Sequence, residues 1–253
     1  MSHVPQSPPT EVAPGIHRIT GAASNFYLVE QPGGGLTLVD AGTPGDWTLF
    51  LRSLDTLGHR LGDLDAVVLT HAHPDHVGFA ERARREGPTS VWVHNDDAAV
   101  AQGAKPGKSD AGLARYLART EFYRTTISLS RRKGAKIIPV VEVSTFADDE
   151  VLDVPGKPRA VHTPGHTPGN AALYFEDRLA VISGDTLITR NPLTGRTGPQ
   201  VMPSGFNRDT AQALASLSAL ENLNAGIILP GHGDPWHGPI SQAAQLARAA
   251  GPS

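Results

Sequence analysis

The sequence predicts an α/β fold in which two mixed β-sheets pack face to face, with helices on their outer sides. Short apolar runs, typical of strands, form two groups on either side of a helical stretch at residues 110–133. Each group contains tight turns of the hairpin kind as well as helical segments that can connect parallel strands. The length of 253 residues suits one α/β domain.

The first group of strands follows a polar, proline-rich segment, residues 1–14, which we expect to be a flexible tail. Turn residues such as Gly33-Gly34-Gly35 separate the first three runs and indicate antiparallel pairing. Trp47–Leu57 has its large apolar residues at helical spacing, and a second helix is expected over Val77–Glu86, before Gly87. The expected strands are Gly15–Ile19, Asn25–Glu30, Leu36–Val39, Leu64–Leu69 and Ser90–Val93.

The second group of strands lies in the same domain, expected over residues 15–253, after a helical insertion around residues 105–135. The helix of this insertion is expected over Asp110–Lys133, with Ser109-Asp110 at its cap. The strands are expected at Ala135–Val141, Glu150–Val154, Arg159–His162, Ala171–Phe175, Leu179–Ile182 and Ala225–Leu229. A long loop is expected at Asn191–Asn207, and helices at Asp209–Leu223 and Gln242–Ala250.

Composition excludes several classes of function. The net charge is −3 and no long run has one sign, which argues against binding to nucleic acid or to a membrane surface. There is no cysteine, so disulfides, thiolate ligands and a cysteine nucleophile are excluded. No apolar run approaches the ~20 residues of a membrane helix, and no signal peptide is apparent. We expect a cytoplasmic protein with a small-molecule substrate; the sequence predicts no oligomeric state.

Polar residues with metal-binding side chains follow five of the expected strands. These residues are Asp40, the run His71-Ala72-His73-Pro74-Asp75-His76, His166, Asp185 and His232. Residues just past strand ends gather at one edge of a sheet, where ligands bind. Five such endings in one chain therefore predict a shared site.

The spacing of residues 71–76 predicts two metal positions. Side chains alternate along an extended segment, so His71 and His73 face the same way, and Pro74 then turns the chain towards Asp75 and His76. Imidazole and carboxylate ligands without sulfur suit Zn²⁺ or another first-row divalent ion. We expect His166 to complete the first position and His232 the second. Asp185 is expected to bridge them, one oxygen to each ion.

With these motifs the sequence resembles the metallo-β-lactamase-fold hydrolase superfamily. The motifs appear in the order of the family: Leu38-Val39-Asp40, the run from His71 to His76, Thr163-Pro164-Gly165-His166, Ser183-Gly184-Asp185-Thr186 and Pro230-Gly231-His232-Gly233. The resemblance implies a four-layer αββα sandwich. It also implies that His71, His73 and His166 hold one ion, and that Asp75, His76 and His232 hold the other, with Asp185 shared. Asp40 is expected to orient a metal ligand by a hydrogen bond.

The function expected from the resemblance is hydrolysis of an ester, lactone or thioester, as in glyoxalase II and the lactonases. Two ions, expected to be Zn²⁺ with iron or manganese as alternatives, lower the pKa of a shared water towards ~7, and the resulting hydroxide attacks the carbonyl. The resemblance gives Asp75 the catalytic role of orienting this nucleophile or accepting its proton. The loop Thr189–Phe206 and the helical stretch with Tyr116 and Tyr123 are expected to border the pocket.

Three alternative functions remain open at this point. The first is β-lactam hydrolysis, against which the absence of a secretion signal argues. The second is an oxidoreductase of the persulfide-dioxygenase type, which uses this fold with one iron. The third is a metal-stabilised binding protein without catalysis. A complete second set of ligands favours a binuclear hydrolase over the last two.

Overall fold

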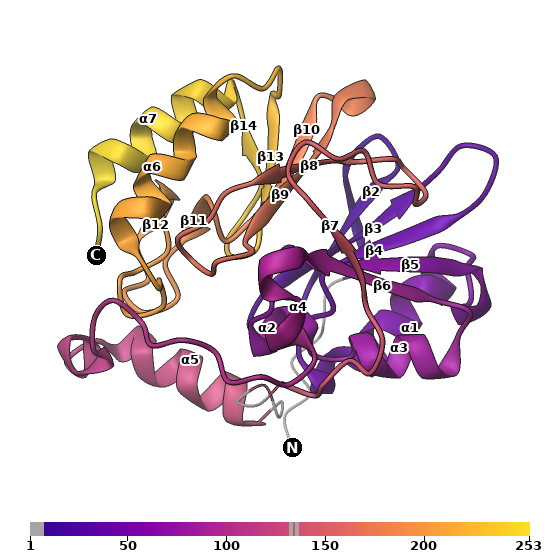
Figure 1. The fold of residues 1–253 in the computed structure, drawn as a ribbon, viewed down its shortest axis with the longest axis horizontal. Helices are drawn as coiled ribbons and strands as arrows, with labels where there is room; N and C mark the ends of the chain where they lie inside the picture. Colours follow the sequence, from indigo (N-terminus) through magenta and orange to yellow (C-terminus); the bar gives the residue numbers. More distant parts are fainter. Residues whose placement is uncertain (1–7, 132–133, 135–136) are drawn as a thin grey trace.

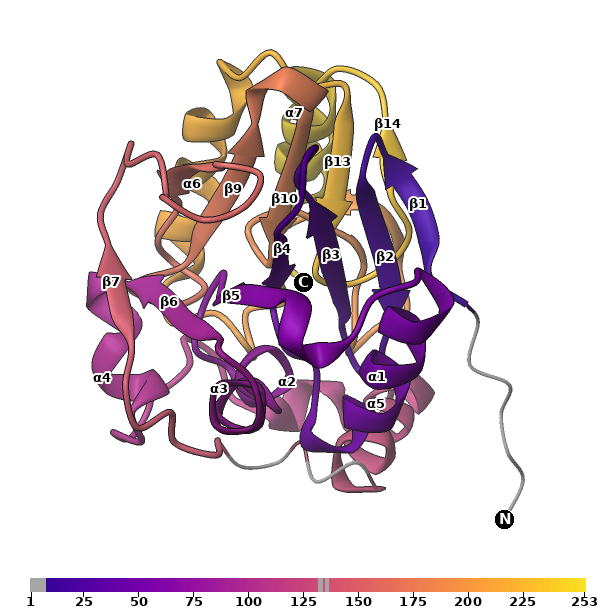
Figure 2. The same ribbon diagram turned by 90° about the vertical axis from the view of Figure 1, so that its right-hand side faces the viewer.

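The structure, a computed structural model, describes residues 8–131, 134 and 137–253. In this part of the chain two mixed β-sheets face each other, and helices cover the outer side of each sheet (Figures 1 and 2). The arrangement is the αββα sandwich predicted from the sequence. Within the same residues no helix has the length and apolar character needed to cross a membrane.

The first sheet contains seven strands among the described residues and follows their order along the chain. These strands are Thr10–Ala13 (β1), Ile16–Thr20 (β2), Asn25–Glu30 (β3), Leu36–Val39 (β4), Leu64–Val68 (β5), Ser90–His94 (β6) and Ser144–Phe146 (β7). Strands β1 to β4 pair antiparallel, and β4 to β7 pair parallel. The helices of this half are Trp47–Thr56 (α1), Pro74–Val77 (α2), Ala80–Glu86 (α3), Ala98–Ala101 (α4) and Thr120–Arg131 (α5).

The second sheet has the order β14-β13-β10-β9-β8, and only β10 and β13 pair parallel in it, as far as the described residues go. Its strands are Arg159–His162 (β8), Ala171–Phe175 (β9), Ala180–Gly184 (β10), Ile227–Pro230 (β13) and Trp236–His237 (β14). A separate hairpin is formed by Ile188–Arg190 (β11) and Thr197–Gln200 (β12). Helices Thr210–Glu221 (α6) and Ile240–Ala250 (α7) lie together on the outer face (Figure 1).

Apolar side chains fill three layers, one between the sheets and one beneath each layer of helices. Strand β3 illustrates the alternation that produces them. Phe26 and Leu28 point to α1 and α3, where Phe26 packs edge-on against Phe79, while Tyr27 and Val29 point to the second sheet. The third layer joins the second sheet to α6 and α7. Each sheet thus packs against helices on one face and against the other sheet on the opposite face.

The N-terminal tail is shorter than the sequence predicted, because Thr10–Ala13 pair with β2 as an edge strand. The expected strand at 135–141 is wrong for residues 137–141, which form no ladder; Pro139 lacks a backbone N–H to donate. Residues 135–136 lie outside the described part. The expected strand at 150–154 is reduced to one bridge, from Val151 to Arg159.

The predicted helix at 110–133 is also wrong in its first ten residues. Of the described residues 110–119, Leu113–Tyr116 form a 3₁₀ turn, and the helix α5 begins at Thr120. Residues 132–133 lie outside the described part. Asp110 does not cap a helix of its own: its Oδ2 accepts from the backbone N–H of Thr210, the first residue of α6, at 3.2 Å. The expected helix 77–86 is divided at Gly78, where a Cβ would lie 2.0 Å from the carbonyl oxygen of Gly42. This close approach brings the loop after β4 against the His71–His76 loop.

Candidate metal centre

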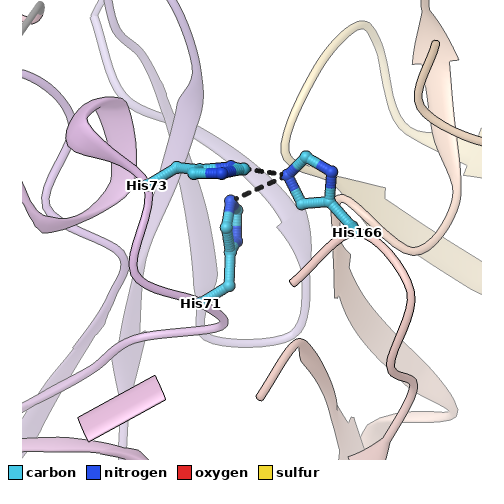
Figure 3. A group of neighbouring side chains, drawn as sticks. All are labelled: His71, His73 and His166. Carbon is cyan, nitrogen blue, oxygen red and sulfur yellow. Dashed lines mark hydrogen bonds between the residues drawn. The ribbon is translucent and has the colours of Figure 1, made fainter. Parts of the chain in front are cut away.

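Three histidines from two sheets meet with their ring nitrogens facing one another (Figure 3). His71 and His73 lie on the loop between β5 and α2, and His166 lies on the loop after β8. The Nε2 atom of His166 is 2.8 Å from Nδ1 of His73 and 3.2 Å from Nε2 of His71. The alternation expected for an extended His71–His73 segment is therefore present.

A second set of donors lies beside the first and consists of Asp75, His76 and His232. Asp75 and His76 lie in the first turn of α2, because Pro74 begins this helix directly after His73. His232 follows β13. The Oδ2 atom of Asp75 is 3.9 Å from Nε2 of His76 and 3.7 Å from Nε2 of His232.

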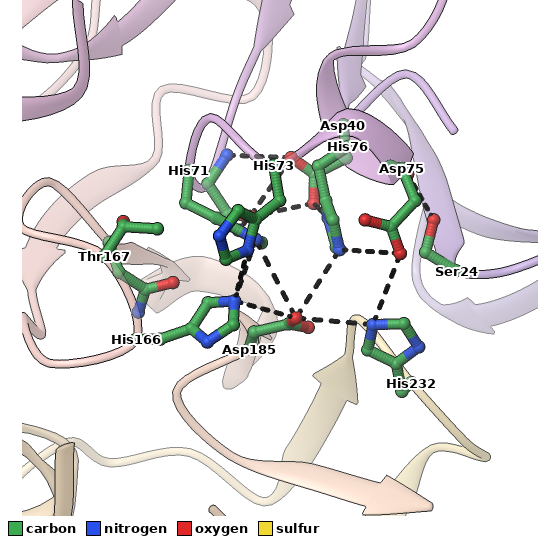
Figure 4. Close-up of polar contacts among 12 residues, drawn as sticks. Ser24, Asp40, His71, His73, Asp75, His76, His166, Thr167, Asp185 and His232 are labelled. Atoms are coloured by element: carbon green, nitrogen blue, oxygen red, sulfur yellow. Dashed lines mark hydrogen bonds and ion pairs between the residues drawn. The ribbon is translucent and has the colours of Figure 1, made fainter. Parts of the chain in front are cut away.

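Asp185 lies between the two sets of donors (Figure 4). Its Oδ2 atom is 3.3 Å from Nε2 of both His166 and His232, 3.6 Å from that of His76 and 3.8 Å from that of His71. The loop carrying Asp185 runs close to Gly231, where a Cβ would lie 2.2 Å from Oδ1 of Asp185. The seven residues expected to bind metal thus converge on one volume, with Asp185 central to both sets.

The donors fit divalent cations of the first transition row. Ligand atoms about 2.0–2.1 Å from a tetrahedral Zn²⁺ are about 3.3 Å from one another. The separations around His166 and Asp185 are close to this value. The buried Nε2 of His76 and Oδ1 of Asp185 have no hydrogen-bond partner among the described residues. Buried polar atoms without partners are costly, and binding to a cation would supply a partner to such an atom.

The histidines of the first set favour the neutral form that binds metal. Burial, and then the charge of neighbouring histidines, lowers the pKa of both His71 and His73 well below that of a free imidazole. Each ring therefore presents a lone pair at neutral pH. Asp185 is ionised as well: burial would raise its pKa, but His232 and His76 hold it well below the usual range.

The second set has the opposite electrostatic character. Burial disfavours the charged form of His76, but the carboxylates around it, Asp40 first, outweigh burial and raise the pKa of His76 to about 10. Burial also disfavours the charged form of His232, but Asp185 and Asp75 outweigh it and raise the pKa of His232. A cation at this set must displace a proton.

Asp40 accepts a hydrogen bond from the ring of His76, as the sequence predicted for a residue that orients a ligand. Its Oδ2 is 2.8 Å from Nδ1 of His76, so the other nitrogen, Nε2, faces Asp75 and Asp185. Thr70 donates to the same carboxylate from its backbone N–H and from its hydroxyl. The backbone of Asp40 is left-handed, with φ of 62°, a conformation that Asp and Asn tolerate better than most residues.

Two further residues support the centre and were not predicted from the sequence. The Oδ1 atom of Asn207 is 3.1 Å from Nδ1 of His166, so it can accept the ring proton and leave Nε2 for a metal. Asp97 accepts from the N–H of Ala72, the hydroxyl of Thr167 and the N–H of Gly169, which joins both histidine loops. Asp97 follows β6, so the rule that selected the other strand-end residues could have found it. Asn207 ends a long loop and carries no such signal.

Two hollows flank the centre. The first, of about 290 Å³, is the Arg208 hollow, lined by residues 72–73, 96–97, 100, 105–109, 166–168, 205–206 and 208. The second, of about 230 Å³, is the Arg190 hollow, lined by residues 22–23, 121, 124–125, 128, 190, 192 and 232–233. The segment Thr189–Phe206 borders both hollows, as predicted, although it is not one long loop, because it contains β12 and most of β11. The helical stretch also forms a wall as predicted, since α5 lines the Arg190 hollow. Its two tyrosines do not: Tyr116 is buried and bonds to Ser204, and Tyr123 lines neither hollow.

The rings of His94 and His162 pack against each other and are not part of the centre. Their rings stack at 4.0 Å between centroids, and Nε2 of His162 lies 2.8 Å from the carbonyl oxygen of Pro168. Asp96 lies about an ion-pair distance from both rings, at 3.9 Å and 4.0 Å. These separations are at the upper end of those among the seven donors, which run from 2.8 Å to 3.9 Å.

Comparison with known proteins places these residues in a family context. The model of the metallo-beta-lactamase superfamily matches residues 19–232. The probable metallo-hydrolase YflN of Bacillus subtilis is 28% identical over 244 residues, which cover 90% of this chain and 87% of that protein.

Solved structures show the same fold. A metallo-beta-lactamase family protein of Thermus thermophilus superposes with a TM-score of 0.68 at 24% identity, covering 95% of this chain and 80% of its own. MEM-A1, a subclass B3 metallo-beta-lactamase from a soil metagenome library, superposes with a TM-score of 0.69 at 19% identity, covering 96% and 94%.

Proposed function

The chain belongs to the metallo-beta-lactamase superfamily, and on this premise we propose that it hydrolyses an ester, lactone or thioester at a centre of two divalent metal ions. His71, His73 and His166 would hold one ion, and Asp75, His76 and His232 the other, with Asp185 shared. Zn²⁺ is the ion we propose. One observation carries the proposal: seven donors converge in two adjacent sets, and Asp185 reaches both.

Each part of the reaction has a residue suited to it. Two bound ions would supply an activated water and polarise the carbonyl group of the substrate. Asp75 has an outward position, with its side chain 17% exposed, whereas Asp185 is 2% exposed. Asp75 can therefore orient the attacking water and accept its proton. Asp40 and Asn207 would keep His76 and His166 in the tautomers that expose Nε2 to the ions.

The proposal is tested with a panel of activated esters, lactones, thioesters, β-lactams and phosphodiesters on metal-replete protein. We expect one of the first three classes to have the highest kcat/KM, and EDTA to abolish turnover. Faster cleavage of a cephalosporin or carbapenem than of every ester-type substrate would replace the proposal with β-lactam hydrolysis. A reproducible content of one iron per chain, unchanged by added Zn²⁺, would favour the persulfide-dioxygenase alternative instead.

Asp75→Asn tests the role of the outward carboxylate. The amide has the same size and cannot accept a proton, so we expect the fold to persist and kcat to fall about 100-fold or more. Thermal unfolding and metal content measured on the same sample separate loss of catalysis from loss of metal. An unchanged kcat would remove Asp75 from the mechanism.

A further inference from the structure

The Arg208 hollow holds three cationic side chains that have no ion-pair partner in the described part of the chain. Lys105, Lys108 and Arg208 line it, and all three are exposed. Among the described residues no carboxylate lies within ion-pair distance of any of them. His73 and His166 form the inner wall of the same hollow, so the cations lie directly beside the first set of metal donors.

The backbone fixes these cations relative to the centre. The N–H of Arg208 donates to the carbonyl oxygens of Gly165 and His166, at 3.0 Å and 3.1 Å. The loop that carries both lysines is held at its two ends: Ala104 N–H donates to Ala99, and Asp110 N–H donates to Asn207. Arg208 also packs on this loop, since a Cβ at Gly107 would lie 1.7 Å from its Nη1.

The acidic residues of the Arg208 hollow do not neutralise it. Asp97 is buried, and its two oxygens already accept three hydrogen bonds from Ala72, Thr167 and Gly169. Asp96 lies at the rim, and the cations within 4 Å of its carboxylate, in the described chain, are the histidines His94 and His162. The hollow therefore offers cations that have no counter-ion among the described residues.

In the Arg190 hollow, on the other side of the centre, the cationic side chains are balanced by a carboxylate. It also contains two guanidinium groups, but Glu121 lies between them. Its carboxylate is 2.7 Å from Arg190 and 3.3 Å from Arg124, and these partners lower the pKa of Glu121. The two hollows thus differ in charge although both border the donors.

We propose that the Arg208 hollow binds an anionic group of the substrate, a carboxylate, sulfonate or phosphate, while the scissile carbonyl lies at the metal centre. This inference rests on the proposed hydrolytic function and narrows it to acyl compounds with a negatively charged end. Arginine and lysine bind such groups through charge-assisted hydrogen bonds. Phe206, Val100 and Pro168 supply an apolar wall along which a short acyl chain can lie. A hollow of about 290 Å³ suits a chain of a few carbon atoms.

Two esters that differ in one charge test the proposal: the 4-nitrophenyl monoester of glutarate and 4-nitrophenyl butyrate. We expect the metal-replete enzyme to prefer the anionic ester in kcat/KM. Arg208→Gln should lower that preference about tenfold, mainly through KM, and leave the neutral ester unaffected. Lys105→Gln and Lys108→Gln should each have smaller effects in the same direction. Lys157→Gln is the matched control, because it removes one exposed charge that lines neither hollow.

A binding measurement decides the inference independently of turnover. By isothermal titration calorimetry, glutarate should bind the metal-replete protein about tenfold more tightly than butyrate, and Arg208→Gln should remove the difference. If the enzyme cleaves neither ester, the wider substrate panel decides the proposed function, and this binding measurement alone decides the anion site. Equal binding of the two acids, or an equal effect of Arg208→Gln on both esters, would overturn the inference.

Discussion

The two sides of the metal centre use the same residue types and differ in charge. His71 and His73 lie next to other histidines. Burial, together with the charge of these neighbours, lowers the pKa of both rings. His76 meets three carboxylates, those of Asp40, Asp185 and Asp75, and they raise its pKa to about 10 against the effect of burial. The difference teaches that one fold has built two unlike sets of donors a few ångströms apart: the rings of the first set are neutral at neutral pH, whereas a cation at the second would compete with protons.

The largest effect is expected where the two sides meet. Asp185→Ala removes the oxygen that approaches histidines of both sets, so both ions should be lost and kcat/KM should fall by more than about 100-fold. His232→Ala is the matched variant, which should lose chiefly the ion of the second set. Elemental analysis after removal of free metal distinguishes them. Full metal content in Asp185→Ala would show that the sides are not coupled through this residue.

A smaller effect is expected from Asp40→Asn, which acts on the second set alone. Asn tolerates the left-handed backbone at this position, but its amide group would offer an N–H to Nδ1 of His76. The ring proton would then move to Nε2, the atom that should bind metal. We expect the second ion to bind about 10- to 100-fold more weakly while the first is unaffected. Stepwise titration with Zn²⁺ against a chromogenic chelator measures both affinities, and equal weakening of the two would contradict this assignment.

The pH dependence of binding should differ between the sides as well. A raised pKa means that His76 keeps its proton up to about pH 10 when no metal competes. Binding of the second ion must release this proton, so for each proton released the affinity should rise about tenfold per pH unit. The rise should stop once the pH passes the pKa of the histidine. The His71 and His73 rings are already neutral, so the first ion should show little change between pH 7 and pH 9. Titrations with Zn²⁺ at three pH values test this contrast. If the affinities of both ions change equally with pH, the contrast between the two sides is wrong.

The smallest effect is expected from Asn207→Ala, on the opposite side from Asp40. Asn207 offers His166 a neutral acceptor in place of a carboxylate, and a neutral hydrogen bond contributes about 0.5–1.5 kcal/mol. The first ion should therefore bind about 3- to 10-fold more weakly. A loss as large as that of Asp40→Asn, in the same titration, would mean that the charge of the acceptor does not decide how firmly the ring is oriented.

The convergence of the seven expected donors could be predicted from the sequence because these residues carry local signals. His71, His73, Asp75 and His76 lie in one short run, and the strands that precede His166 and Asp185 have strong apolar patterns. Strand β9 matches its predicted bounds because both of its faces are buried. The sheet layers followed from the two groups of apolar runs.

What the sequence could not predict depends on contacts between distant segments. Asn207 acts on His166 only because the loop after β12 folds back on the loop after β8. Asp110 accepts a hydrogen bond from the first residue of α6, whose N-cap is Asp209, and does not cap a helix of its own. The short strand β14 has no periodic pattern and pairs because β13 offers it an edge. Such elements follow from the tertiary structure and leave little trace in local sequence.

The position of the centre across the seam of the sandwich has a mechanical consequence. Four donors belong to the half with the first sheet, and the other three follow strands of the second sheet. Each bound ion would therefore cross-link two halves of a chain that has no cysteine and hence no disulfide. Cross-links between distant segments restrict the unfolded chain, and more so when the loop that they close is long. The ions would then stabilise the fold as well as take part in catalysis. Resistance to heat and to proteolysis would therefore depend on the concentration of metal around the protein.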